Sequence, residues 1–204
     1  MTVLSILMKI PIIGPLLKIA NAYAYQGDYK ATYEFAGFWC WIRSVGPELT
    51  LAVALALATL WQLIEKSWIA KSIQPCAEEF YCKPGSLIVA FVPSTLGFGI
   101  GVYALIFGLS AYLVKDVKGA VERQKLSGKR KDGSELMLNS DMAFPLVVLT
   151  FSLFLGIFQQ IFPGSIVLIA LTWVVLWYAI ISIFDLISVI FGMADNSLLE
   201  KTKD

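Results

Sequence analysis

Two of the three cysteines lie close together, and thiols have the widest range of chemistry among the residues of this chain. Cys76 and Cys82 frame the segment CAEEFYC, which separates two long apolar stretches. Such a pair can bind zinc, take part in redox exchange or form a structural disulfide. Zinc needs four good ligands and the chain has no histidine, while redox pairs are usually spaced C-x-x-C. We therefore expect a Cys76–Cys82 disulfide in an oxidising compartment, and a buried or interfacial thiol at Cys40.

No other combination of residues has the pattern of an active site. Without histidine, the chain lacks the commonest general base and the commonest metal ligand. It also lacks a G-x-S-x-G motif, a phosphate-binding loop and paired carboxylates at helical spacing in an apolar stretch. The net charge of +1 gives no reason to expect direct binding of nucleic acid. We expect a protein that is not an enzyme and that carries no cofactor or metal ion.

The composition is that of a membrane protein. Hydrophobic residues make up 58% of the chain, charged residues only 15%, and the mean hydropathy is +0.74; soluble domains carry about 25% charged residues. Met142–Phe184 contains 43 residues without a charge. As one helix this stretch would be about 65 Å long, about twice the hydrocarbon thickness of a bilayer. It must fold back on itself, and Pro163-Gly164 supplies the turn.

These runs predict an all-α integral membrane protein with four transmembrane helices. Pro47 is expected in the first turn of the first helix, where proline is well tolerated. The predicted order is an interfacial N-terminal segment at 1–46, spans at 47–68, 86–114, 143–162 and 165–192, an outer loop at 69–85, a basic loop at 115–142 and a tail at 193–204.

The distribution of basic residues predicts the orientation. The loop at 115–142 holds seven of the 16 lysines and arginines. The polar island between the first two apolar runs holds three, Lys66, Lys71 and Lys83, and the turn between the last two spans holds none. Because cytoplasmic loops carry an excess of lysine and arginine, we expect this loop and both termini in the cytoplasm. The cysteine pair then faces outward. The expected location is the bacterial inner membrane.

The first 46 residues are expected to lie in the inner membrane interface, in contact with membrane lipids. Lys9 and Pro11 interrupt the apolar start, and no basic region precedes it, so a cleaved signal peptide is not predicted. The aromatic residues that follow are typical of the belt at a membrane–water interface. They are Tyr29, Tyr33, Phe35, Phe38, Trp39 and Trp41.

Small residues recur along the second span at three- and four-residue steps. Such spacing lets two helix backbones approach closely. The pattern does not distinguish packing within the subunit from oligomerisation or from a narrow pore. The residues are Ser94, Gly97, Gly101, Ala104 and Gly108.

Three polar residues lie at or next to the ends of the two uncharged stretches at 143–162 and 165–184. Asp185 follows the uncharged run, and an ionisable group at membrane depth is a candidate for function. Alternatively, Asp185 is an edge charge at the cytoplasmic interface. Gln159 and Gln160 are expected near the outer boundary, facing water or each other across subunits.

The basic loop is the predicted docking surface for a soluble cytoplasmic partner. Contact of the same charges with anionic lipid headgroups is the alternative. The residues expected to dock the partner are Arg123, Lys125, Lys129, Arg130 and Lys131.

The plan of the whole chain resembles the membrane component of the bacterial Kiwa anti-phage defence system, the small four-span KwaA family. The stretches MKIPIIGPLLKIANAYAYQGDYKATYEFAGFWCW and CAEEFYCKPGS, set on four spans and a basic central loop, carry the resemblance. It implies an inner-membrane homo-oligomer, with a tetramer favoured, that senses phage infection. It also implies a soluble cytoplasmic effector that binds phage DNA. No site residue is carried over.

We therefore expect a homo-oligomeric sensor and scaffold in anti-phage defence. A small oligomeric channel that depolarises the membrane is the alternative from a different class, based on the glycines and Asp185. An accessory subunit that only stabilises a neighbouring complex is the third.

Overall fold

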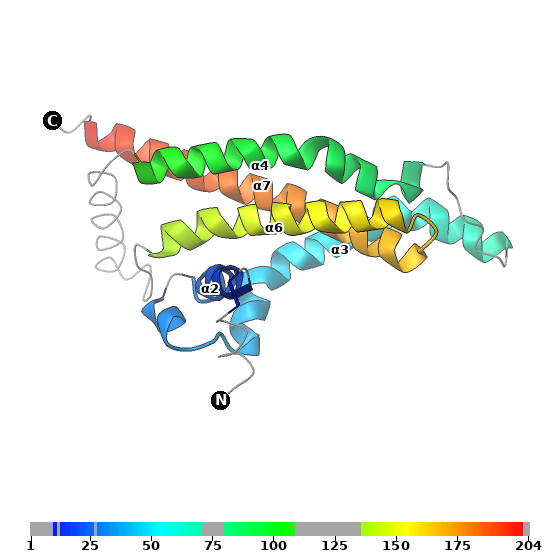
Figure 1. Cartoon of the computed structure of the whole chain (residues 1–204), viewed down its shortest axis with the longest axis horizontal. Coiled ribbons are helices and arrows are strands. Elements are labelled where there is room, and N and C mark those ends of the chain that lie inside the picture. Colours follow the sequence, from blue (N-terminus) through cyan, green and yellow to red (C-terminus); the bar gives the residue numbers. More distant parts are fainter. Residues whose placement is uncertain (1–9, 12, 27, 71–79, 109–135, 202–204) are drawn as a thin grey trace. The chain divides into compact units, whose positions relative to one another are not determined.

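The computed structural model describes residues 10–11, 13–26, 28–70, 80–108 and 136–201 (Figure 1). Every regular element in these ranges is a helix. The elements are α2 (Ile13–Ala24), η1 (Tyr29–Thr32), α3 (Phe38–Ala70), η2 (Phe80–Cys82), α4 (Pro84–Gly108), α6 (Leu136–Ile161) and α7 (Ile166–Lys201).

The prediction of an all-α membrane protein with four transmembrane helices is confirmed. Four of the described helices are long and apolar enough to cross a bilayer. Their apolar parts are Phe38–Trp61, Pro84–Ile106, Leu138–Ile161 and Ile166–Gly192.

The first long helix, α3, begins earlier than the sequence suggests. It starts at Phe38, where the amide of Cys40 bonds to the carbonyl oxygen of Gly37 at 2.9 Å. Pro47 therefore lies inside the helix, and its expected place in the first turn is wrong. The residues before Pro47 are mostly apolar, so they extend the span. The extension brings Glu48 into the apolar part of the helix.

The other long helices also pass their predicted ends. Helix α4 begins at Pro84, a residue suited to the first helical position. Helix α6 begins at Leu136, within the predicted basic loop, and α7 continues to Lys201, within the predicted tail. The turn at 162–165 between α6 and α7 contains the proline-glycine pair at 163–164.

The chain forms two compact units, and each of the four long helices contributes to both. In the first unit, Figure 1 looks along α2 and across the start of α6, so these two helices cross. The ring of Tyr23 on α2 stacks on Phe144 of α6, with centroids 4.0 Å apart and an interplanar angle of 10°. The hydroxyl of Ser44 on α3 donates to the carbonyl oxygen of Tyr23 at 3.3 Å. Helix α2 is thus fixed to both neighbours.

Asn21 on α2 fixes the loop that leads into α3. Its buried amide nitrogen donates to the carbonyl oxygens of Ala31 and Glu34, both at 2.9 Å. Its amide oxygen accepts the backbone N–H of Ala36 at 2.8 Å. One side chain therefore satisfies three backbone groups of this loop.

The second unit comprises Pro47–Gly99 and Val148–Ile183. In this unit, the buried residues of α3 recur at every fourth position and are Ala52, Ala56 and Leu60. The indole Nε1 of Trp177 on α7 donates to the hydroxyl oxygen of Thr59 on α3 at 3.0 Å. This hydrogen bond thus joins two helices whose facing sides are mostly apolar.

Candidate functional site

One exposed side of α4 carries a row of small residues, with the exposed large side chains of Ile100 and Leu105 at its edges. We call this set the small-residue face. It includes four of the five small residues predicted from the sequence and adds three more that lie nearer the start of the helix. The fifth predicted residue, Gly108, is the last residue of α4 and is not part of the face. The face consists of Ser86, Ala90, Pro93, Ser94, Gly97, Gly101 and Ala104.

The glycines of this face have open space around them. A Cβ atom added to Gly97 or to Gly101 would meet nothing within 4 Å. Neither glycine therefore packs against another part of the subunit in the described ranges. The glycines that do allow close packing inside the subunit are Gly85 and Gly156.

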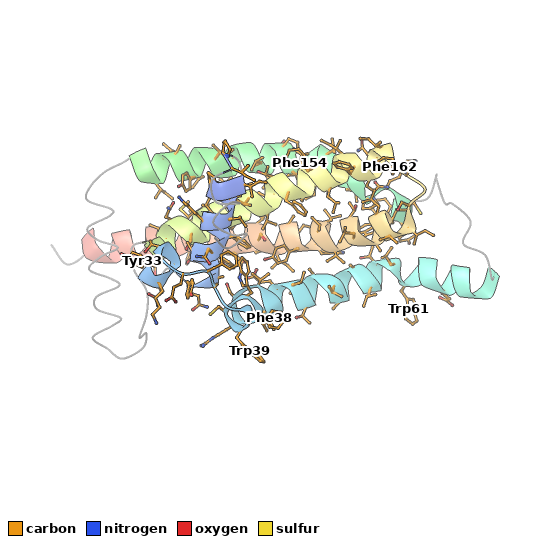
Figure 2. The ribbon with its side chains drawn as sticks, turned by 60° about the horizontal axis from the view of Figure 1, so that its bottom comes forward. Tyr33, Phe38, Trp39, Trp61, Phe154 and Phe162 are labelled. Carbon is orange, nitrogen blue, oxygen red and sulfur yellow. The ribbon has the colours of Figure 1, made fainter. Side chains whose placement is uncertain are left out.

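The exposed sides of the other three long helices are different, because they carry large apolar side chains. Figure 2 shows Trp61 on α3 and Phe154 on α6 pointing away from the ribbon. Along α4, no large hydrophobic side chain from Pro84 to Gly97 is exposed, whereas Phe98, Ile100 and Leu105 are exposed in the part that follows. Large exposed side chains on the other helices include Leu57, Phe151, Phe158, Val167, Leu171 and Phe184.

The opposite side of α4 is tightly packed. Gly85, Ile88, Val92 and Gly99 are buried there. A Cβ atom on Gly85 would overlap the carbonyl oxygen of Gly156, and one on Gly156 would lie 2.8 Å from Cγ2 of Ile88. The backbones of α4 and α6 therefore meet without an intervening side chain.

Gln159 links the start of α4 to α6. Its Oε1 accepts the backbone N–H of Gly85 at 3.0 Å, and its Nε2 donates to the carbonyl oxygen of Cys82 at 3.0 Å. Only 2% of its surface is exposed. The expectation that it faces water or another subunit is wrong, because it satisfies two backbone groups inside its own subunit. Gln160 is exposed.

The segment that carries Cys82 is held from two sides. Trp173 on α7 donates from Nε1 to the carbonyl oxygen of Tyr81 at 2.7 Å, and its ring lies 6.1 Å from that of Phe80. Cys82 itself is buried. Cys76 lies outside the described residues, so the Cys76–Cys82 disulfide stays a prediction. Cys40 is a half-buried free thiol.

Asp185 lies within the apolar part of α7, half-buried, seven residues before its end at Gly192. At 1.5 Å per residue, this is roughly 10 Å inside the span. Glu48 is a second acid inside a span, and it was not anticipated because the start of α3 was predicted nine residues too late. Acids at such depth are candidates for function.

The N-terminal part of α3 and the loop before it expose aromatic rings. Tyr33 is 87% exposed, Phe38 74% and Trp39 79% (Figure 2). Phe35 and Trp41 are half-buried, with ring centroids 6.1 Å apart. Because the apolar span begins at Phe38, rings at this level suit the interface between lipid and water.

The predicted docking residues Arg123, Lys125, Lys129, Arg130 and Lys131 all lie in 109–135, outside the described residues. Within the described ranges, no group of three or more histidine, cysteine, aspartate or glutamate side chains could hold a metal ion.

Sequence reasoning missed two features that a closer look at spacing and polarity could have indicated. Ser86 and Ala90 continue the helical phase of the small-residue face, so the pattern extends upstream of Ser94. Gln159 is one of two glutamines in a run of 43 uncharged residues, and a polar side chain at that depth needs a hydrogen-bonding partner. Nothing in the sequence indicates that the partner is Gly85.

Comparison of the chain with protein-family models, with curated proteins and with solved structures finds no match.

Proposed function

We propose that the protein is a multi-pass membrane scaffold that self-associates through the small-residue face of α4. The observation that carries this proposal is the open space at Gly97 and Gly101 on an exposed, membrane-spanning helix. In a membrane, a glycine on the surface of a helix favours association because it lets the backbone of a second helix approach closely.

A second copy explains this face better than lipid does. Lipid chains are matched equally well by leucine, isoleucine or phenylalanine, and these residues cover the exposed sides of α3, α6 and α7. A face with only small side chains gives a lipid chain no additional contact. It gives a facing helix a short interaxial distance, and with it extensive van der Waals contact.

The resemblance to the membrane component of the Kiwa system supports a role in anti-phage defence. We propose that the scaffold lies in the bacterial inner membrane with both termini in the cytoplasm. The outer segment, closed by a Cys76–Cys82 disulfide, would register disturbance of the envelope. The basic loop would dock a soluble DNA-binding effector, with membrane lipids as the other partner. Replacing Lys129, Arg130 and Lys131 by glutamine is expected to weaken co-purification of that effector; unchanged binding would remove the docking proposal.

The test of self-association uses native mass spectrometry of the detergent-solubilised protein. Gly97→Leu and Gly101→Leu fill the gap with a side chain, so each should weaken association by at least about tenfold, or roughly 1.4 kcal/mol. Gly192→Leu is the matched control, because Gly192 is also helical, exposed and without neighbours within 4 Å of an added Cβ. Equal oligomer populations in all four proteins would contradict the proposal.

A channel is the second candidate, and the observation that favours it is Asp185, half-buried in the apolar part of α7. In a conducting oligomer, a carboxylate at this depth would attract cations. Planar-bilayer recording separates the two candidates. A reproducible conductance that changes with Asp185→Asn would favour the channel. Absence of conductance from the intact oligomer would favour the scaffold.

A further inference from the structure

Helix α4 has two functionally different sides in the second unit, and its rotation about its own axis decides which side points out. The buried side carries Ile88 and Val92, and the exposed side carries Ala90, Ser94 and Gly97. Successive residues of a helix are separated by about 100° around its axis. A rotation by one residue would therefore replace Gly97 with Phe98 at the centre of the exposed side.

We infer that Gln159 is the positioning residue that sets this rotation and so presents the small-residue face of α4 to a second copy. The inference rests on the proposed self-association and adds the residue that directs it. Gln159 does not belong to the small-residue face, since it lies buried on α6.

The hydrogen bond to Gly85 restricts the rotation of α4 about its axis more narrowly than apolar packing does. The first amides of a helix have no acceptor within the helix, and Gln159 Oε1 supplies one to Gly85 at 3.0 Å. The contact of Gly85 with Gly156 and the burial of Ile88 and Val92 also favour this setting, but dispersion contacts tolerate a small rotation better than a hydrogen bond does. Turning α4 would move the Gly85 N–H away from its acceptor and leave both groups buried and unsatisfied.

The second hydrogen bond of Gln159, to Cys82, fixes the orientation of the Gln159 side-chain amide. Its Nε2 is held by the carbonyl oxygen of Cys82, so the amide oxygen points at Gly85 and not elsewhere. The close approach of Gly85 and Gly156 keeps this distance short. Through these two hydrogen bonds, Gln159 on α6 holds the backbone at Cys82, just before α4, and at Gly85, in the first turn of α4.

Disulfide cross-linking between copies in membranes tests the inference. Single cysteines are placed on the face, at Ala90, Ser94 and Gly97, and on its flank, at Phe91 and Phe98, in a Cys40→Ser background. With Gln159 intact, cross-linking should be strongest on the face. Gln159→Leu should shift the maximum to the flank, whereas general destabilisation would lower all positions alike.

Two variants complete the test. Gln160→Leu changes the exposed neighbour and should leave the profile unaltered. Gln159→Glu in its neutral form, which burial favours, keeps an acceptor oxygen for Gly85 and an O–H donor for Cys82, so it should restore the face profile. An unshifted profile in Gln159→Leu, or a flank profile in Gln159→Glu, would overturn the inference. Absence of cross-linking at every position of the protein with Gln159 intact would instead remove the proposed self-association.

Discussion

The side chain of Gln159 accepts a hydrogen bond from the backbone of Gly85, 74 residues earlier in the chain, at 3.0 Å. The contact requires that α4 and α6 approach without a side chain between them, since a Cβ on Gly85 would overlap the carbonyl oxygen of Gly156. The glycine is thus needed for space at this site. On the opposite side of the same helix, no described residue lies within 4 Å of a Cβ added to Gly97 or Gly101, so these glycines have no such role in the part of the subunit that the structure describes.

Gly85→Ala and Gly101→Ala should therefore have opposite effects on the stability of the monomer. At Gly85 the obstacle is backbone, which cannot move aside, so we expect a loss of about 1–3 kcal/mol. At Gly101 nothing lies within 4 Å, and alanine is the better helix former by about 0.5–1 kcal/mol. Reversible unfolding in mixed detergent micelles, under monomeric conditions, measures both changes. A tolerated alanine at Gly85 would show that the two helices can separate without cost.

Hydropathy alone was enough for the fold class. Long uncharged runs exclude a soluble fold, and the proline-glycine pair at 163–164 marks a reversal, so four spans follow from lipid solvation. The start of α3 could not be found this way. Pro47 looks like a helix start because proline suits that position, yet proline is also tolerated inside membrane helices, where neighbours can satisfy the freed backbone group.

The candidate site was predictable only in part. The periodic small residues from Ser94 to Ala104 identify one face of a helix, but periodicity does not say whether that face is covered. The exposure of Gly97 comes from the packing of Ile88 and Val92 on the other side. Likewise, the polarity of Gln159 says that a partner is needed, while the identity of the partner depends on the tertiary contact of two helices distant in the sequence.

Asn21→Ala should loosen the loop between α2 and α3. The substitution removes three hydrogen bonds and leaves the buried N–H of Ala36 without its acceptor. We expect a loss of about 1–3 kcal/mol, confined to the N-terminal part. Hydrogen exchange followed by mass spectrometry should show faster exchange in residues 31–36. Lys18→Ala, an exposed change on the same helix, is the control. Equal protection in both variants would mean that the loop is fixed by other contacts.

The bond between Thr59 and Trp177 should couple α3 to α7 measurably. Thr59→Val and Trp177→Phe each remove the bond and keep most of the apolar volume. In a double-mutant cycle, the coupling free energy should be about 0.6 kcal/mol, the average for hydrogen bonds between membrane helices, and should not exceed about 1.7 kcal/mol. Trp173→Phe, whose indole bonds to Tyr81 instead, should show no coupling to Thr59→Val. A coupling free energy near zero for Thr59 and Trp177 would mean that the bond contributes nothing net.

The proposed orientation predicts which ends of the long helices an impermeant reagent can reach. Gly164 lies exposed in the turn between α6 and α7, and Asp195 lies exposed beyond the apolar part of α7. Because cytoplasmic loops collect lysine and arginine, and the turn contains neither, Gly164 should face outward and Asp195 inward. In a Cys40→Ser background, a membrane-impermeant maleimide should label Gly164→Cys in intact cells and label Asp195→Cys only after permeabilisation. The reverse pattern would place the basic loop outside, where a cytoplasmic effector could not reach it, and the cysteine pair inside, where a stable disulfide is not expected.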